Sequence, residues 1–495
     1  MNFILEAIRG TFIPTRLQTS LAGNYCDYPN PENSTAINEE SEGTAIHEHI
    51  HYFQTVFTGF GQTAWNTHRI VTGHIVNEWI KATNNYVQQR PLPLAYLASK
   101  EIKDKALALF LYKTVMESLK PLTARHAIKD PSLKLSDLAI NINSHPWHIN
   151  PIIECRGEKI YLQGKDVLEN HAQNMEAIYS FLINKIPFIK SYDWDVLPKR
   201  YYFLYSWFLS NVGHERILEF PIICDLALQA IPEMVINTEE EWRKSSPSWR
   251  FVRLTEALKN LKILDFIRKP QDIINYYSTY CDHLLNYCGY DSLEKIFQMR
   301  QRSLRSLGEQ SIMEQTMDQA LDFRREHPWC GANPFLDTSI WIEMKNRFPP
   351  LLIQTEDGLR VTLLPADRRQ VLVKEFIMEL QIQALAAQIM GDLSIDDKSR
   401  GAVKCGFKYF NIPHGCHYQT EKSCCGILNP KEGAPFPLVI HQDEFEGCWF
   451  EATLNLYGTA ISNIDVRYGY KMPTMEELLK EFDEKSEIEK KEEAL

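Results

Sequence analysis

Apolar residues recur at helical spacing along most of the chain, and this pattern predicts a mainly helical protein. The predicted helices lie at 36–58, 62–84, 100–119, 165–185, 253–267 and 367–390. Two other stretches, 2–28 and 351–364, are expected to be extended. In the second stretch, Asp357-Gly358 lies between two apolar runs, which is typical of a β-hairpin. The predicted fold class is therefore mainly α with minor β, an α+β arrangement.

Breaks in the pattern indicate how the chain is organised. The polar stretch 237–249 and the stretch 327–335, which contains Pro and Gly, are predicted to be linkers. At roughly 150 residues per domain, a chain of 495 residues has room for about three domains. The expected regions are 1–195, 196–400, 401–473 and 474–495. The second is a helical body that contains the hairpin, the third is rich in Cys and His, and the fourth is a charged tail to which we assign no function.

One short segment has a spacing with a chemical meaning. Residues 47–51 read His-Glu-His-Ile-His and contain the motif His-Glu-x-x-His. On a helix, His47 and His51 are one turn apart, so their imidazoles can share a Zn²⁺ ion. Glu48 can then reach a water molecule on that ion. A helix with two hydrogen-bonded histidines and no metal is the alternative interpretation.

The residues around the motif favour a buried helix. Ile46, Ile50, Phe53 and Phe57 fall on one side of a helical wheel and form an apolar stripe. His47 and His51 lie beside this stripe, whereas His49 points elsewhere and is excluded as a ligand. Gln54 lies one turn beyond His51 and is expected to orient it.

This segment resembles the zincins, the superfamily of zinc metallopeptidases with the motif His-Glu-x-x-His. The metzincin subgroup is excluded, because its Gly and third His would stand where this chain has Gln54 and Phe57. The resemblance therefore implies a carboxylate as third ligand, on a different helix. The common aminopeptidase-like spacing would place that carboxylate at residue 70, which is Ile70 in this chain.

Glu169 is the preferred third ligand. Its segment is similar to the Glu-x-x-Ala-x-x-x-Glu helix of several metallopeptidase families, in which the first Glu binds zinc. Gln173 and Glu176 share its helix face, beside an apolar stripe that can pack against the first helix. Glu78 and Glu215 are the alternatives that we keep open.

The resemblance implies that region 1–195 is a zincin-like catalytic region and that the chain is a zinc-dependent peptide-bond hydrolase. Glu48 would act as the base, and Tyr179 and His214 are guesses for the group that stabilises the oxyanion. The large body favours a narrow or regulated protein or peptide substrate, with a regulatory partner not identified. By fold-level analogy with bacterial phage-exclusion proteases, the enzyme is expected to act as an effector protease.

A non-hydrolytic metal-binding protein is the alternative. A di-iron site would need a second Glu-x-x-His segment, and the chain has none beyond 48–51. A scaffold with a purely structural zinc site is the other form of this alternative.

Two further patterns are weaker. Residues 59–64, Gly-Phe-Gly-Gln-Thr-Ala, match a dinucleotide-binding fingerprint, but they follow a predicted helix and not a strand, so a turn between helices is preferred. Cysteines and histidines gather near the C-terminus, where a second, structural metal site or plain packing are both open. The proposed ligands there are Cys405, Cys416, Cys424 or Cys425, and a histidine such as His417.

The overall charge limits the partners. The chain has 53 Lys and Arg against 64 Asp and Glu, a net charge of −11, so duplex nucleic acid is not expected as a partner. No segment has the length and apolar character of a membrane span, and none is expected to act as a secretory signal. Because the 11 cysteines are an odd number spread over a long chain, we expect reduced thiols and a cytoplasmic location.

Overall fold

The computed structural model describes residues 10–13, 18–21, 39–63, 65, 150–182, 201–229, 239–260, 269–305, 312–348, 352–355, 358–361 and 382. The chain divides into two compact units. The first consists of residues 1–68, 115–129 and 144–364, and the second of residues 69–114, 130–143 and 365–495. All described residues except 382 belong to the first unit, and the predicted boundary at residue 195 falls within it.

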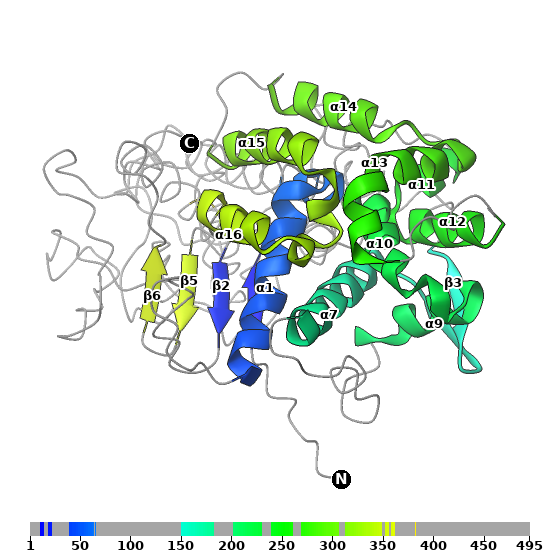
Figure 1. Cartoon of the computed structure of the whole chain (residues 1–495), viewed down its shortest axis with the longest axis horizontal. Helices are drawn as coiled ribbons and strands as arrows, with labels where there is room; N and C mark the ends of the chain where they lie inside the picture. The colour runs from blue at the N-terminus through cyan, green and yellow to red at the C-terminus, as the bar shows by residue number, and fades with distance from the viewer. Residues whose placement is uncertain are drawn as a thin grey trace, which may run out of the picture. The chain divides into compact units, whose positions relative to one another are not determined.

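Helices dominate the described residues of the first unit, as predicted (Figure 1). They are α1 (Glu39–Phe57), α7 (Gly164–Leu182), α9 (Phe203–Val212), α10 (Phe220–Leu228), α11 (Glu239–Ser245), α12 (Pro247–Asn260), α13 (Pro270–Tyr287), α14 (Leu293–Arg305), α15 (Ile312–Glu326) and α16 (Thr338–Arg347). The 3₁₀ segments are η2 (His214–Glu219), η4 (Pro328–Gly331) and η5 (Pro334–Leu336). The strands are β1 (Gly10–Ile13), β2 (Gln18–Leu21), β3 (Ile152–Cys155), β4 (Glu158–Tyr161), β5 (Leu352–Thr355) and β6 (Gly358–Val361). The fold class, mainly α with minor β, is confirmed.

The predicted β-hairpin is present in a mixed sheet. Strands β5 and β6 pair antiparallel from Leu352 opposite Val361 to Thr355 opposite Gly358. This hairpin joins the N-terminal pair β1 and β2 in a four-stranded sheet of order β1-β2-β5-β6. The pairing of β2 with β5 is parallel and was not predicted, because it joins segments from opposite ends of the unit.

A second hairpin, β3 with β4, was also not predicted. Its two-residue turn has positive φ at Arg156 (51°) and Gly157 (79°), as tight hairpin turns require. An Arg at the first turn position is unusual, which explains why the sequence pattern gave no turn signal.

The described residues of both predicted linkers, 239–249 and 327–335, are folded, so neither stretch is the unstructured connection that the sequence suggested. The stretch 237–249 contains α11 and the start of α12. Its charges stabilise a short helix, since Glu239, Glu240 and Glu241 occupy the first turn and Arg243 and Lys244 the last. The stretch 327–335 does connect two helices, but it forms η4 and η5 and buries Trp329, Cys330 and Phe335.

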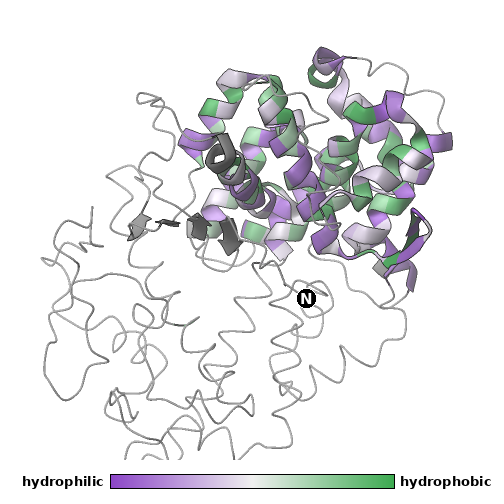
Figure 2. Cartoon of the chain, turned by 90° about the horizontal axis from the view of Figure 1, so that it is seen from below, coloured by the Kyte–Doolittle hydropathy of each residue, from purple (hydrophilic) through white to green (hydrophobic). Residues whose placement is uncertain are grey.

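Helix α1 is the central element of the described part of the chain. It contacts α7, α15, β1 and β2 (Figure 1). The predicted apolar stripe is buried, with Ile46, Ile50, Phe53 and Phe57 at 5% exposure or less. Burial extends around the helix, however, because Glu48, His49 and Gln54 are also below 9% exposure. Figure 2 shows hydrophobic and hydrophilic residues alternating along the surrounding helices, which is the pattern of amphipathic helices around a core.

The C-terminal end of α1 lies inside the protein and needs hydrogen-bond donors there. The carbonyl of Phe57 accepts hydrogen bonds from Arg300 Nη1 at 2.8 Å and from Arg324 Nη1 at 3.1 Å. Both arginines are fully buried. They satisfy a carbonyl that the helix itself cannot satisfy, at its negative dipole end.

Asp225 supplies the negative charge that Arg324 needs in this interior. Arg324 donates to Asp225 Oδ1 at 3.0 Å and to Oδ2 at 2.6 Å, and both side chains are fully buried. Tyr277 and Gln229 also donate to the Asp225 carboxylate. Burial raises the pKa of Asp225, but Arg324 outweighs this effect and the net pKa is lowered. The network joins α10, α13 and α15 to the end of α1.

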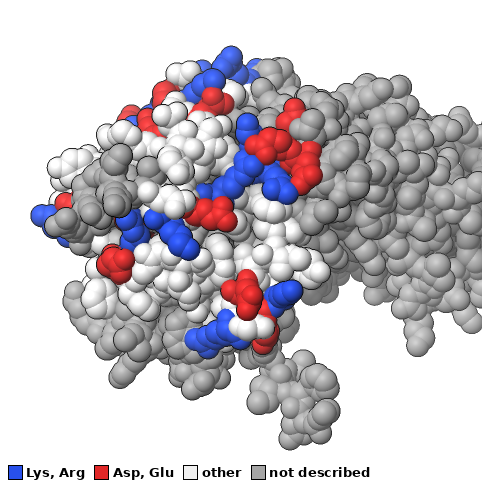
Figure 3. All heavy atoms as spheres, turned by 90° about the vertical axis from the view of Figure 1, so that its right-hand side faces the viewer, with Lys and Arg blue, Asp and Glu red and all other residues white. Residues whose placement is uncertain are grey.

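The surface differs from this interior. On the face shown in Figure 3, Lys and Arg side chains are interspersed with Asp and Glu. Within the described residues, no helix has the length and apolar character needed to cross a bilayer.

Removing Arg324 should destabilise the protein strongly. Arg324→Met leaves Asp225 charged and unpaired in the interior, and we expect a loss of about 3–5 kcal/mol in the free energy of unfolding. Arg305→Met is the matched control, because Arg305 is 57% exposed and also forms a two-bond pair with an aspartate, Asp318. Its loss should be below about 1 kcal/mol. Equal losses in denaturant titrations of the two variants would contradict this account of the interior.

Candidate metal centre

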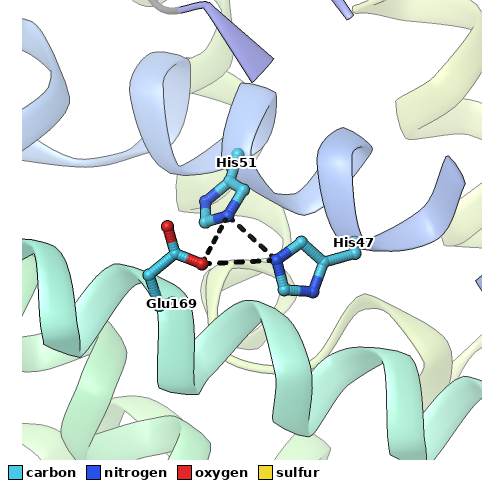
Figure 4. A group of neighbouring side chains, drawn as sticks. All are labelled: His47, His51 and Glu169. Atoms are coloured by element: carbon cyan, nitrogen blue, oxygen red, sulfur yellow. Dashed lines mark hydrogen bonds and ion pairs between the residues drawn. The ribbon is translucent and has the colours of Figure 1, made fainter. Parts of the chain in front are cut away.

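Helices α1 and α7 pack together and bring three predicted ligands to one point. His47 and His51 project from successive turns of α1, and Glu169 projects toward them from α7 (Figure 4). His47 Nε2 lies 3.1 Å from His51 Nε2. Glu169 Oε2 lies 3.6 Å from each of these nitrogens. The structure thus brings together the residues that the sequence suggested as ligands.

The size of this triangle fits a transition-metal ion. For sides of 3.1, 3.6 and 3.6 Å, the point equidistant from the three atoms lies about 2.0 Å from each. Zinc is bound by imidazole nitrogen at about 2.0–2.1 Å and by carboxylate oxygen at about 2.0–2.2 Å. The spacing of the three atoms therefore fits a single zinc ion bound by all of them. Two imidazole nitrogens and one carboxylate oxygen are also the donor set of many catalytic zinc sites.

The second nitrogen of each imidazole faces an acceptor. His47 Nδ1 lies 3.3 Å from Glu176 Oε2, and His51 Nδ1 lies 2.7 Å from Gln54 Oε1. Such contacts hold metal-binding imidazoles in one orientation and raise their basicity. Both partners stand where the sequence pattern placed them, Glu176 near the trio and Gln54 one turn after His51.

Gly43 makes room for one of these contacts. It lies one turn before His47 on α1, and a Cβ at this position would be 2.9 Å from Glu176 Oε1. Only glycine leaves the Glu176 carboxylate in its present place. The sequence pattern did not identify Gly43, because a glycine within a helix gives no sign of what it lies against.

The electrostatics of the trio favour a cation. Burial lowers the pKa of His47, but hydrogen bonds to Glu169 and Glu176 and the charge of Glu48 raise it to about 10. Burial raises the pKa of Glu169, but His51 and His47 hold it well below its usual range. A proton on His47 thus occupies the region in which a metal ion would lie.

Glu48 and Tyr201 also belong to this neighbourhood. Glu48 follows His47 on α1 and is buried, at 6% exposure. The ring of Tyr201 meets the His47 ring edge-on, with centroids 5.9 Å apart. No spacing in the sequence pointed to Tyr201, which lies in a run of aromatic residues just before α9.

Two other histidines near the trio are buried in different surroundings. His49 packs against Phe53 and Trp341, and burial with the charge of Lys345 lowers its pKa to about 3. His49 does not belong to the trio, in keeping with its position on the helical wheel. His171, two residues after Glu169 on α7, is 2% exposed and forms a hydrogen bond with Gln54, and burial lowers its pKa as well.

The remaining residues named from the sequence fall elsewhere. The Tyr179 ring packs against Phe335, 5.2 Å between centroids, and His214 and Glu215 lie in η2. Glu78 and the C-terminal group of Cys405, Cys416, Cys424, Cys425 and His417 lie outside the described residues. Within the described part of the chain, His47, His51 and Glu169 are the only group of three or more side chains that could hold a metal ion.

Comparisons with protein-family models, with curated proteins and with solved structures found no match for this chain.

The metal-free protein should lose stability as the pH rises toward 10. The pKa of His47 is raised from 6.5 to about 10 in the folded protein. Protonation of His47 therefore stabilises the fold fully below pH 6.5, and this contribution to the free energy of unfolding is lost as the pH rises through about 10. Glu176→Gln removes one source of this shift. Denaturant titrations in chelator from pH 6 to 10 should show a shallower decline for the variant than for the wild type. Parallel curves would show that Glu176 does not stabilise charged His47.

Proposed function

We propose that the chain is a zinc-dependent metallopeptidase in which His47, His51 and Glu169 bind the ion. The observation that carries this proposal is the triangle of ligand atoms, which has the dimensions of one face of a zinc coordination tetrahedron. The motif His-Glu-x-x-His adds Glu48, a carboxylate that a purely structural site would not need.

His47, His51 and Glu169 would supply three protein ligands, and catalytic zinc sites with three protein ligands bind a water molecule as well. When bound, Zn²⁺ lowers the pKa of that water and polarises the carbonyl of the scissile peptide. Glu48 accepts the proton of the attacking water and returns it to the leaving amine. The Tyr201 ring contacts the His47 ring, and we propose it as a source of an oxyanion donor in place of Tyr179, which packs against Phe335, and His214, which lies in η2.

Low exposure of His47 and Glu48, at 7% and 6%, supports a narrow or regulated choice of protein or peptide substrate. The Glu169 side chain is 32% exposed, so the trio is open to solvent at this ligand. Such restricted access is the setting expected of an effector protease that acts on a limited set of proteins. The five cysteines in the described residues, Cys155, Cys224, Cys281, Cys288 and Cys330, are all free thiols, which supports a cytoplasmic location.

A non-hydrolytic metal protein is the second candidate. A structural zinc site would have a fourth protein ligand, and none accompanies the trio within the described residues. A peptidase needs Glu48 as its base, whereas a non-hydrolytic metal protein does not. Both candidates need Glu169 as a ligand.

Glu169→Ala should weaken Zn²⁺ binding by several orders of magnitude, because it removes one of three protein ligands. Glu78→Ala, which removes the alternative ligand considered from the sequence, should leave the affinity unchanged. Competition with a chromogenic chelator measures both affinities. Loss of binding in the Glu78 variant and not in the Glu169 variant would assign the third ligand to Glu78 instead.

Glu48→Gln should bind Zn²⁺ with the affinity of the wild type and fold normally, yet fail to hydrolyse peptides. Mass spectrometry of a peptide library incubated with the zinc-loaded proteins would detect cleavage. Cleavage by the variant at the rate of the wild type would remove Glu48 from the mechanism. Loss of zinc from the variant would instead make Glu48 a ligand.

A further inference from the structure

A chain of hydrogen bonds leads from His51 away from the trio and into the core. His51 Nδ1 meets Gln54 Oε1 at 2.7 Å, and Gln54 Nε2 meets His171 Nδ1 at 3.2 Å. His171 Nε2 in turn meets the carbonyl of Ala332 at 3.1 Å. We propose that His171 is a positioning residue that acts through Gln54 to hold His51 in the tautomer that offers Nε2 to the metal. This inference rests on the proposed metal site.

The direction of each hydrogen bond follows from two backbone carbonyls. Gln54 Nε2 lies 2.9 Å from the carbonyl of Leu168, which can only accept a hydrogen bond. The NH₂ end of the Gln54 amide must therefore face Leu168, and its oxygen must face His51. Because Gln54 Oε1 can only accept, His51 carries a proton on Nδ1, and in the neutral imidazole Nε2 then has the lone pair that a metal needs.

The same reasoning fixes His171. The carbonyl of Ala332 can only accept, so the proton of His171 is on Nε2. His171 Nδ1 then has a free lone pair, which accepts the second N–H of the Gln54 amide. Two carbonyls at the ends of the network, one on α7 and one between η4 and η5, thus determine the tautomers of both histidines.

Because Gln54 and His171 are buried, the orientation of the Gln54 amide depends on His171. Gln54 and His171 are 3% and 2% exposed, so solvent is poorly placed to replace a lost partner. Without His171, one N–H of the Gln54 amide would be buried with no acceptor, which is unfavourable. The amide would then rotate toward another arrangement and no longer hold His51. Leu168 alone satisfies only one of the two N–H groups.

The network also connects the metal site to the buried charge network. Ala332 follows η4, and the carbonyl of Pro328 in η4 accepts a hydrogen bond from Arg324 Nη2 at 3.1 Å. The same Arg324 binds the end of α1 at Phe57. Arg324 thus contacts both η4, which directly precedes Ala332, and the end of the helix that carries His51.

The test is the Zn²⁺ affinity of the full chain, measured by chelator competition. His171→Leu should lower the affinity about tenfold, as loss of a contact behind a metal ligand commonly does. His171→Asn should restore most of it, because its Oδ1 can accept from Gln54 where Nδ1 did. His49→Leu, which removes another buried imidazole near the trio, should leave the affinity unchanged and controls for general destabilisation.

A double-mutant cycle shows whether His171 acts through Gln54. Gln54→Leu should lower the affinity, and adding His171→Leu to that variant should lower it no further. If His171→Leu does not fold, His171→Gln replaces it, since its longer amide extends toward Ala332 and leaves the Gln54 N–H without its acceptor.

The outcomes separate this inference from the proposed function. The positioning role of His171 would be overturned if His171→Leu bound Zn²⁺ with wild-type affinity. It would also be overturned if His171→Leu lowered the Zn²⁺ affinity equally in the wild type and in Gln54→Leu. Either result would leave the metal site intact. If the wild type binds zinc no better than Glu169→Ala, the metal site itself fails and this inference with it.

Discussion

The buried carbonyl of Phe57, at the end of α1, is the constraint on which the rest of the structure depends. A helix that ends in the interior leaves carbonyl groups without partners, and the cost of this falls only when donors are brought to them. Arg300 and Arg324 supply those donors from α14 and α15. Asp225 on α10 makes the buried charge of Arg324 tolerable. The position of α1 is thereby fixed at one end, and with it the direction in which the two histidines project.

The candidate metal centre forms where α7 packs against α1. Glu169 and Glu176, two turns apart on α7, reach the opposite nitrogens of the His47 ring. The pKa of His47 is raised by three carboxylates, those of Glu48, Glu169 and Glu176. Together they outweigh burial, which by itself lowers this pKa. One proton on His47 leaves the cluster of His47 and the three carboxylates with an excess of negative charge. A divalent ion would neutralise more of it, which is the electrostatic reason for expecting a metal here.

The sequence predicted the parts of this account that depend on local spacing. Residues one turn apart on α1 and the Glu-x-x-Ala-x-x-x-Glu pattern on α7 were visible as periodicity, and so was the hairpin at Thr355 and Gly358. The contacts made by single residues far apart in the chain were not visible. The pairing of His171 with Ala332 and of Arg324 with Phe57 depends on tertiary packing, which no window of sequence contains. The stretch 237–249 shows the opposite error, because charged residues that suggested a linker stabilise a short solvated helix.

The central claim, that His47, His51 and Glu169 bind zinc, is tested most directly by X-ray absorption at the zinc edge of the wild-type protein loaded with one equivalent of Zn²⁺. The account predicts only nitrogen and oxygen neighbours, with two imidazole nitrogens at about 2.0–2.1 Å and oxygen at about 2.0–2.2 Å. Sulfur neighbours at about 2.3 Å would show that cysteines hold the ion. That result, or the absence of bound zinc, would contradict the account.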